Sequence, residues 1–228
     1  MTELPPIAIV MVTYKRTREA LETVRSTCEN LVYPKELRRW YVGDDGSPKE
    51  HMDAILKALS GETLMGWHSE RLRKPGQEDT YFAGLGWNKA LGIGHQYSEF
   101  VLFLEDDWVL EKPLELAPYV KILTEHEDVG IVTFRILSIG ADVHTVGYDG
   151  VHFLKYLRTT QYAYSGNPLL RHGRFTRHYG WFGEEHNPGD IELDLDSRFR
   201  EKEGPEIIRP LNISPWGGWS HIGTDKTW

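Results

Sequence analysis

The sequence predicts an α/β fold, with a mostly parallel sheet flanked by helices and a β-rich segment after it. Short apolar runs alternate with stretches of helical periodicity through the first 135 residues, as is typical of a right-handed parallel sheet. Beyond that point, β-branched and aromatic residues with glycine punctuation indicate hairpins over residues 142–164. At 228 residues, the chain fits one domain with two halves, residues 1–135 and 136–228.

The expected strands are short apolar runs bounded by turn residues. They cover residues 7–13, 39–42, 63–68, 100–104, 129–134 and 206–211. Helices are expected where apolar residues recur every three or four positions. They run from Thr17, as cap, to near Pro34, then over residues 52–59, 81–94 and 113–126, and from Asp190, as cap, to about residue 204.

Composition limits the partners and the compartment. A net charge of −8 argues against broad nucleic-acid binding, although a local basic patch is compatible with it. The single cysteine, Cys28, excludes an internal disulfide framework and fits a reducing compartment. No apolar run approaches the roughly 18 residues of a membrane span, and the N-terminus lacks the features of a signal peptide. We therefore expect a cytoplasmic protein without a transmembrane segment.

The most informative stretch is the apolar run 100–104, which leads directly into Glu105, Asp106 and Asp107. Ligands of open α/β sheets bind just outside the carboxyl ends of the strands. Three adjacent carboxylates repel one another unless a positive group lies among them. A hard divalent cation would fill that role because it prefers oxygen ligands. The alternative is a solvated acidic turn that ends a buried strand.

Three segments together resemble GT-A-fold inverting glycosyltransferases of family two, which use nucleotide-sugar donors. The first is Ile7-Ala-Ile-Val-Met-Val-Thr-Tyr-Lys-Arg16, and the second is Tyr41-Val-Gly-Asp-Asp-Gly-Ser47. The third is Gly86-Trp-Asn-Lys-Ala-Leu91 followed by Leu102-Phe-Leu-Glu-Asp-Asp107. Each motif alone is weak, but their order and spacing match the family over about the first 130 residues. The resemblance implies that residues 1–135 bind the nucleotide-sugar and residues 136–228 face the acceptor.

The resemblance also implies which residues hold the donor. Thr13 and Tyr14, with Arg16 of the same motif, should contact the nucleotide, and Asp45, with Asp44, should pair with the base edge. A carboxylate suits a uracil-type imide because it accepts the N–H proton, so a UDP-sugar is the expected donor. Asn88 and Lys89 are the corresponding helix contacts, although Trp87 stands where the family usually has arginine.

The acidic step corresponds to the Asp-x-Asp metal motif of the family. Glu105 and Asp107 occupy its two acidic positions, with Asp107 as the direct ligand of Mn²⁺ or Mg²⁺, and Asp106 between them faces the sugar. Many family members place a histidine near the end of the domain as a further ligand, and His221 lies where that residue falls.

The catalytic base in this family comes from a later acidic loop before a helix. Asp190 is the best match, and Glu184 and Glu185 are close alternatives. A plain helix N-cap is the structural alternative for Asp190, worth about 1 kcal/mol. The implied reaction is a one-step displacement at the anomeric carbon with inversion.

The acceptor is open and ranges over a glycan, a small molecule, a protein or a modified nucleic acid. Arg158, Arg171, Arg174 and Arg177 face either an anionic acceptor or plain solvent. His172 and His178, among these arginines, are expected to be solvated or to face the acceptor.

Two other functions compete with glycosyl transfer. A nucleotidyltransferase that makes nucleotide-sugars would carry a glycine-rich basic loop after its first strand, where this chain has Thr13-Tyr-Lys-Arg16. A noncatalytic nucleotide-sugar or glycan-binding module would be indicated by loss of the acidic positions, and these are present.

Overall fold

The computed structural model describes residues 3–72, 83–134, 141–166, 168–186, 188–211 and 218–223 of the chain. The predicted loop over residues 69–80 and the tail after residue 214 lie largely outside these ranges. The first half alternates strands and helices as predicted. Its main elements are β1 (Ile7–Thr13), α1 (Thr17–Asn30), β3 (Arg38–Asp44), α2 (Lys49–Ala58), β4 (Leu64–Ser69), α3 (Gly84–Tyr97), β5 (Phe100–Glu105), α4 (Ala117–Glu125) and β8 (Val129–Thr133).

Two details of the first half differ from the prediction. Thr17 does not cap α1, because Arg16 occupies the N-cap position and the Thr17 hydroxyl bonds to Nδ1 of His51, 2.8 Å away. The helix expected from residue 113 starts only at Ala117, because β7 (Leu114–Glu115) first pairs with β2 (Leu31–Val32). A short 3₁₀ turn, Lys35–Leu37, precedes β3.

In the described part of the second half, a hairpin and two further strands complete the main sheet. Two helices pack against it, and a short strand lies outside it. The predicted hairpin is confirmed as β9 (Val143–Tyr148) with β10 (Val151–Tyr156), and the predicted late strand as β12 (Glu206–Pro210). The helix with a core stripe of Ile191, Leu195 and Phe199 is α6 (Pro188–Glu201), and all three side chains are fully buried. Three further elements of this half were not predicted, namely β11 (Leu169–His172), α5 (Gly173–Tyr179) and β13 (Trp219–His221), and neither was β6 (Trp108–Leu110) of the first half.

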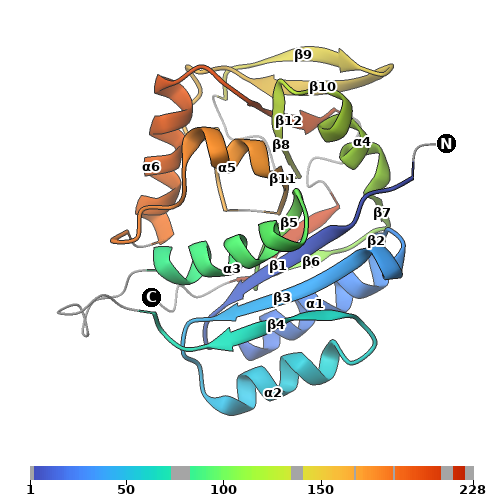
Figure 1. The fold of residues 1–228 in the computed structure, drawn as a ribbon, viewed down its shortest axis with the longest axis vertical. Coiled ribbons are helices and arrows are strands. Elements are labelled where there is room, and N and C mark those ends of the chain that lie inside the picture. Colours follow the sequence, from blue (N-terminus) through green and yellow to red (C-terminus); the bar gives the residue numbers. More distant parts are fainter. Residues whose placement is uncertain are drawn as a thin grey trace.

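The main sheet has nine strands in the order β4-β3-β1-β5-β11-β8-β12-β10-β9, running from bottom to top in Figure 1. Strands β4, β3, β1 and β5 are mutually parallel. β11 then runs antiparallel between β5 and β8, so the sheet is mixed rather than wholly parallel. The carboxyl ends of β1, β3 and β5 therefore meet at one edge, where the predicted motifs lie.

Two layers of helices cover the sheet (Figure 1). One core cluster joins the sheet to α1, α2 and α4 and contains Trp40, Val24, Ile55 and Leu123. The other joins it to α3, α5 and α6 and contains residues such as Trp87, Phe175 and Phe199. Burial of these apolar side chains is the main stabilising term of the fold, at roughly 25 cal/mol per Å² removed from water.

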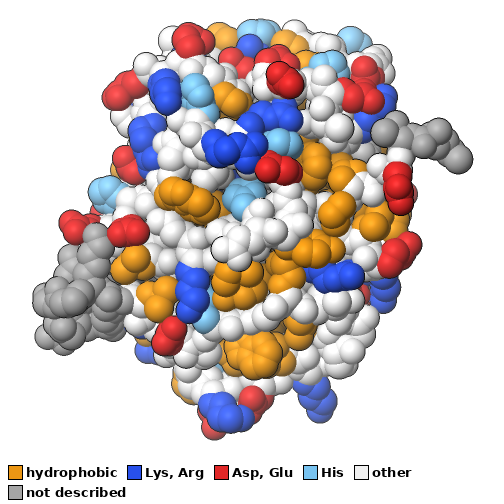
Figure 2. All heavy atoms as spheres, viewed as in Figure 1, with side chains coloured by type: hydrophobic (Ala, Val, Ile, Leu, Met, Phe, Trp, Pro, Cys, Tyr) orange, Lys and Arg blue, Asp and Glu red, His pale blue; other side chains and the backbone are white. Residues whose placement is uncertain are grey.

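The basic residues of the second half are mostly structural. Arg158 donates to the backbone carbonyls of Phe199 and Gly204, 2.5 and 2.8 Å away. Arg174 donates to three carbonyls between α4 and the start of β8, those of Leu123, His126 and Val129. Arg171 is 1% exposed and packs against the rings of Phe175 and Phe182. On the face in Figure 2, acidic and basic side chains are interspersed. The placement of these three arginines does not support an anion-binding surface.

The expectation of a solvated or acceptor-facing His172 is wrong. Its ring is buried, lies edge-on to Phe100 at 5.0 Å, and accepts from the backbone N–H of Arg174 at the start of α5. His178 bonds to the carbonyl of Glu203, 2.7 Å away. Within the described residues, no helix is both long and apolar enough to span a bilayer.

The half-buried His95 makes the stability of the fold depend on pH. Burial lowers the pKa of His95 to about 4, with the Arg171 charge as the next cause. The unfolded chain therefore binds a proton at His95 below about pH 6.5, whereas the folded chain binds it only near pH 4. The stabilising contribution of the neutral ring is present above pH 6.5 and is lost as the pH falls toward 4.

Replacing this group should reduce the acid sensitivity. In His95→Gln, the loss of unfolding free energy between pH 7 and pH 4.5 should shrink by about 2 kcal/mol, as measured by urea denaturation at both pH values. Exposed His144, replaced by Gln in the same way, should leave the loss unchanged. An equal pH dependence of His95→Gln and the unsubstituted protein would contradict this assignment.

Candidate functional site

A cleft opens where β1, β3 and β5 end against the start of α3. It is lined by Val12, Thr13, Tyr14, Arg16, Gly43, Asp44, Asp45, His68, Ala83, Gly86, Trp87, Glu105 and Asp106. Most of the donor-binding residues expected from the sequence therefore come together at one place. Asp107 and His221 lie beside this lining, and Asn88 and Lys89 lie outside it.

Asp106 links the ends of β1 and β5. Its side chain is 1% exposed, and Oδ2 accepts from the Thr13 hydroxyl at 2.7 Å and from the Tyr14 backbone N–H at 3.1 Å. The hydroxyl of Thr23 in α1 donates to the Asp106 carbonyl, 2.9 Å away. Asp106 therefore holds the segment after β1 in place, and its carboxylate points toward β1.

Arg16 neutralises the acidic step. Its guanidinium lies 2.6 Å from Oδ1 of Asp106 and also pairs with Oδ2 of Asp107. The pair is largely shielded from solvent, since Arg16 is 12% exposed. The three consecutive carboxylates predicted from the sequence thus share one internal cation, which reduces their repulsion without cancelling it.

Asp107 contacts His221, although the two residues are 114 positions apart in the sequence. β13 pairs antiparallel with β6, with His221 opposite Trp108, and the Ile222 N–H donates to the Asp107 carbonyl at 2.9 Å. This pairing puts Nε2 of His221 3.0 Å from Oδ2 of Asp107. A side chain on Gly223 would collide with the Asp107 carboxylate, so the backbone there needs glycine to approach so closely.

The two carboxylates after β3 have different surroundings. Asp44 is fully buried and accepts from the Ser47 N–H at 2.9 Å, from the Ser47 hydroxyl and from the Ser69 hydroxyl at 2.6 Å. Asp45 is partly exposed in the cleft, and its Oδ2 lies 3.2 Å from Nε of Arg71. Asp44 therefore stabilises the turn, and Asp45 is the carboxylate that faces the cleft.

The Arg71 side chain lies between Asp45 and the Tyr14 ring. The Arg71 guanidinium lies 4.7 Å from the centre of the Tyr14 ring, within the range of a cation–π contact. His68 bonds through Nδ1 to the Tyr41 hydroxyl, 3.1 Å away. Burial, with the Lys89 charge as the next cause, lowers the pKa of His68 to about 4, so its ring is neutral at neutral pH.

The placement of Asn88 and Lys89 does not support the predicted donor contacts. The Asn88 amide donates to the Phe182 carbonyl and accepts from the Phe182 N–H, both at 3.0 Å, so it ties α3 to the segment before α6. Nζ of Lys89 pairs with Glu70 at 3.1 Å. Both residues line a separate surface hollow beside Trp181.

The three predicted base residues are exposed. Glu184 and Glu185 lie in the segment that leads to α6, and Asp190 is in the first turn of that helix. The placement is compatible with a substrate-facing role but does not bring any of them into the cleft lining. Their catalytic role remains a prediction.

Glu192, two residues beyond Asp190, lies beside the acidic step. Its Oε1 accepts from the Ser165 hydroxyl at 2.9 Å and from the Gly166 N–H at 2.5 Å. A methyl group on Gly166 would lie 3.0 Å from Oε1 of Glu105 and 3.4 Å from Oε1 of Glu192. The two carboxylates therefore flank the same glycine, one from each half of the chain.

Burial and crowding change the acidity of this cluster. The pKa of Glu105 is raised well above its usual value by burial first, and then by the charges of Asp107 and Glu192. Burial also raises the pKa of Asp106 to about 6, with Arg16 and the Thr13 hydrogen bond acting in the opposite direction. The site accumulates more negative charge than Arg16 offsets, which is the condition that favours a bound cation.

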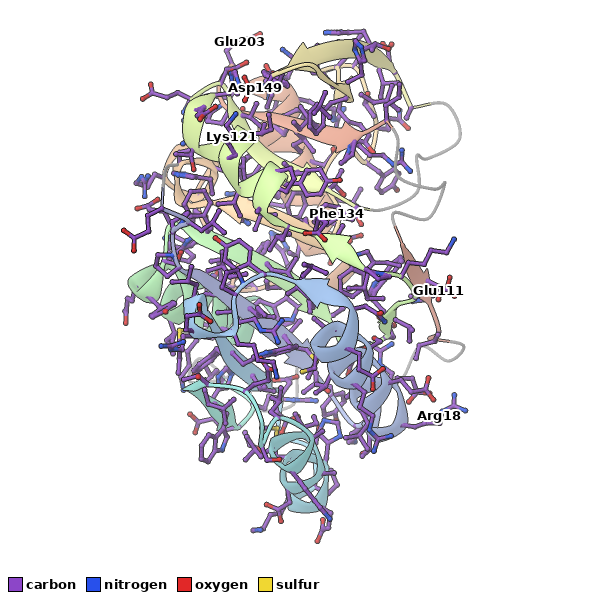
Figure 3. The ribbon with its side chains drawn as sticks, turned by 90° about the vertical axis from the view of Figure 1, so that its right-hand side faces the viewer. Arg18, Glu111, Lys121, Phe134, Asp149 and Glu203 are labelled. Atoms are coloured by element: carbon purple, nitrogen blue, oxygen red, sulfur yellow. The ribbon has the colours of Figure 1, made fainter. Side chains whose placement is uncertain are left out.

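A different group of potential ligands lies elsewhere. Among the described residues, Glu125, His126 and Asp149 bring three potential metal-ligand atoms close together. Lys121 already bridges the two carboxylates, 3.3 and 2.9 Å away. Figure 3 shows Lys121 and Asp149 together at the upper end of the molecule, while Arg18 of α1 lies in its lower part. This cluster is an exposed ion-pair network remote from the cleft.

The sequence and the fold agree on a family. Residues 8–180 match the sequence profile described as glycosyl transferase family 2, and the chain belongs to this family. A search of curated proteins finds no match for the sequence.

Solved glycosyltransferase structures share the fold at low identity. TarS of S. aureus superposes with a TM-score of 0.62 at 14% identity, over 91% of this chain and 35% of that one. The mannosyltransferase PcManGT of Pyrobaculum calidifontis, in complex with GDP-Man and Mn²⁺, gives 0.61 at 16% identity, over 92% and 56%. GalNAc-T7 with UDP, GalNAc and Mn²⁺ gives 0.61 at 13% identity, over 100% and 46%. The chain thus spans between about a third and just over half of the length of these structures, and shares the α/β fold of GT-A glycosyltransferases.

The roles of the two aspartates after β3 can be separated by stability. Asp44→Asn would turn an amide N–H₂ toward groups that already donate, so the free energy of unfolding should fall by about 2 kcal/mol. Asp53→Asn, the same change on the exposed surface of α2, should alter it by less than about 0.5 kcal/mol. Urea denaturation of both variants checks this, and an equal effect of the two would contradict the structural role of Asp44.

Proposed function

We propose that the chain is a metal-dependent glycosyltransferase that moves a sugar from a nucleotide-sugar to an acceptor hydroxyl with inversion. The observation that carries this is the convergence of Tyr14, Asp45 and Glu105 in one cleft, with Asp107 and His221 paired beside it. Family membership and the shared GT-A fold support the same activity.

The residues beside the cleft suit a divalent cation. Oδ2 of Asp107 contacts Arg16 and His221, whereas Oδ1 is buried and has no hydrogen-bond partner among the described residues. Such an atom is costly to bury unless something positive meets it. Asp107 and His221 would therefore hold the ion, and Mn²⁺ or Mg²⁺ suits this oxygen and nitrogen set.

The bound ion would neutralise the charge that develops on the departing diphosphate. Arg16 contributes a second positive charge at the same place, since it already contacts both Asp106 and Asp107. Asp45 and Tyr14 are the proposed base contacts. A carboxylate accepts from the N–H groups of either uracil or guanine, and a UDP-sugar remains the proposed donor.

The chemistry requires one displacement. The acceptor oxygen forms its bond to the anomeric carbon as the bond to the diphosphate oxygen breaks, and the hydroxyl proton passes to a carboxylate of the protein. We assign that carboxylate to α6 or to the segment before it, with Glu192 ahead of Asp190, Glu184 and Glu185. Glu192 is the α6 carboxylate that flanks Gly166 opposite Glu105.

Removal of the proposed metal ligand Asp107 should strongly reduce sugar transfer. Asp107→Ala is expected to lower turnover by at least about a hundredfold and to weaken Mn²⁺ binding measured by titration calorimetry in the presence of UDP or GDP. Glu115→Ala, an exposed acidic residue of β7, is the matched control and should change neither. Wild-type turnover of Asp107→Ala with metal present would remove the metal assignment.

The base can be identified by comparing isosteric variants. Glu192→Gln should lower turnover by roughly 10² to 10⁴ with little change in nucleotide affinity, because a general base acts on the reacting proton. Asp190→Asn and Glu185→Gln should retain most activity. Should Asp190→Asn lose turnover while Glu192→Gln keeps it, the base is Asp190, and an active-site role for Glu192 is wrong.

Two measurements separate the competing functions. Titration with UDP and GDP, with and without Mn²⁺, tests nucleotide binding, and hydrolysis of the corresponding nucleotide-sugars tests catalysis. Binding without hydrolysis or transfer would favour a noncatalytic module, and formation of a nucleotide-sugar from a sugar phosphate would favour a nucleotidyltransferase. The acceptor and a cytoplasmic location remain proposals, the latter supported by the single cysteine.

A further inference from the structure

His51 is a buried polar residue that joins three elements around the cleft. It lies in the first turn of α2 and is 2% exposed. Its Nε2 is 2.9 Å from the Thr13 hydroxyl at the end of β1, and its Nδ1 is 2.8 Å from the Thr17 hydroxyl at the start of α1. Both ring nitrogens are therefore used, and neither partner is a carboxylate.

The directions of these hydrogen bonds allow one arrangement of protons. The single hydroxyl proton of Thr13 is donated to Asp106, so the Thr13 oxygen must accept from Nε2–H of His51. Burial lowers the pKa of His51, which keeps the ring neutral and leaves Nδ1 as an acceptor for the Thr17 hydroxyl. The proton order is Thr17 to His51, His51 to Thr13, and Thr13 to Asp106.

Other groups do not compete for the Nε2 proton. The Asp44 carboxylate is the charged group near the ring, and its Oδ1 is 4.0 Å from Nε2, which is too long for a hydrogen bond. Asp44 already accepts from other donors, at Oδ1 from the Ser47 hydroxyl and at Oδ2 from the Ser47 N–H and the Ser69 hydroxyl. The Thr13 oxygen is thus the partner of Nε2.

We infer that His51 is a positioning residue of the donor site, which orients the Thr13 hydroxyl toward Asp106 and thereby holds the segment 13–16 in its binding conformation. No sequence motif points to His51, because it lies in α2, where the apolar periodicity already accounts for the buried positions. Its effect on nucleotide binding rests on the proposed function, whereas its effect on the segment does not.

The segment needs such support because its backbone is not in a relaxed conformation. Lys15 has φ of 59°, in the left-handed region that residues other than glycine rarely adopt. The Lys15 N–H donates to the Ser47 hydroxyl at 2.8 Å, and the Tyr14 N–H donates to Asp106 at 3.1 Å. If the Thr13 hydroxyl turns away from Asp106, the Asp106 carboxylate loses a donor that fixes its position, and its contacts with the Tyr14 N–H and with Arg16 are weakened.

The tautomer can be tested on the ligand-free protein. Nitrogen-15 NMR of the histidine side chains should show His51 as the neutral Nε2–H form at pH 7. In the same spectra, the amide of Tyr14 should exchange with solvent faster in His51→Leu than in His51→Gln, since glutamine offers an N–H near the position of Nε2. A neutral Nδ1–H ring, or equal exchange in the two variants, would overturn the inference.

Nucleotide binding provides the second test. His51→Leu should raise the dissociation constant for UDP or GDP about tenfold, His51→Gln by less than about threefold, and the exposed neighbour Glu50→Gln not at all. Equal losses in the leucine and glutamine variants would mean that His51 acts by packing alone. If neither nucleotide binds the unsubstituted protein, the proposed function fails, while the tautomer and amide exchange still decide the inference.

A double-variant cycle isolates the relay. Thr13→Val removes the shared hydroxyl, so adding His51→Leu to it should cause no further loss of affinity, and Tyr14 exchange should not increase further. Two independent tenfold losses that multiply to about a hundredfold would show that His51 does not act through Thr13. Circular dichroism of each variant confirms that it is folded before comparison.

Discussion

The structure depends on how negative charge is accommodated at the end of β5. A buried strand delivers three carboxylates to one edge of the sheet, and Asp106 turns back to bind the Thr13 hydroxyl and the Tyr14 N–H. Arg16 then covers Asp106 and Asp107 together. Because β1 and β5 are adjacent and parallel, this contact sets the position of the segment after β1. The cleft is therefore a consequence of charge compensation between neighbouring strand ends.

The first half of the fold was predictable because its signals are local. Each strand is a continuous apolar run, each helix has an apolar stripe, and the polar ends of β1, β3 and β5 necessarily meet in a parallel arrangement. The strand pattern also pointed to Glu105, whereas Thr13 and Asp45 were assigned from the family resemblance, and all three line one cleft. The pairing of Asp107 with His221 came from family resemblance, since nothing local in the sequence connects residues so far apart.

The remaining features could not be predicted from the sequence because tertiary contacts override the local pattern. Arg171 and His172 are polar, yet both are buried in a four-residue strand, so their segment has no apolar signature. The carboxylate of Glu192 is directed by Ser165 and Gly166, in a turn remote from it in the sequence. Asn88 lies within a motif that resembles the family, but its amide group is hydrogen-bonded to the Phe182 backbone. In each case the decisive partner is distant along the chain.

The position of β11 has a consequence for biosynthesis. Strands β5 and β8 follow one another along the chain among the strands of the main sheet, but they do not pair with each other, since β11 lies hydrogen-bonded between them. A nascent chain that has emerged only as far as β8 therefore exposes two apolar strand edges, which are prone to pair with other chains. The strand that carries Glu105 gains its second neighbour only after residue 172 has been synthesised. The residues of the cleft and those of the second half thus belong to one cooperative folding unit, and a fragment ending near residue 135 would lack a complete sheet.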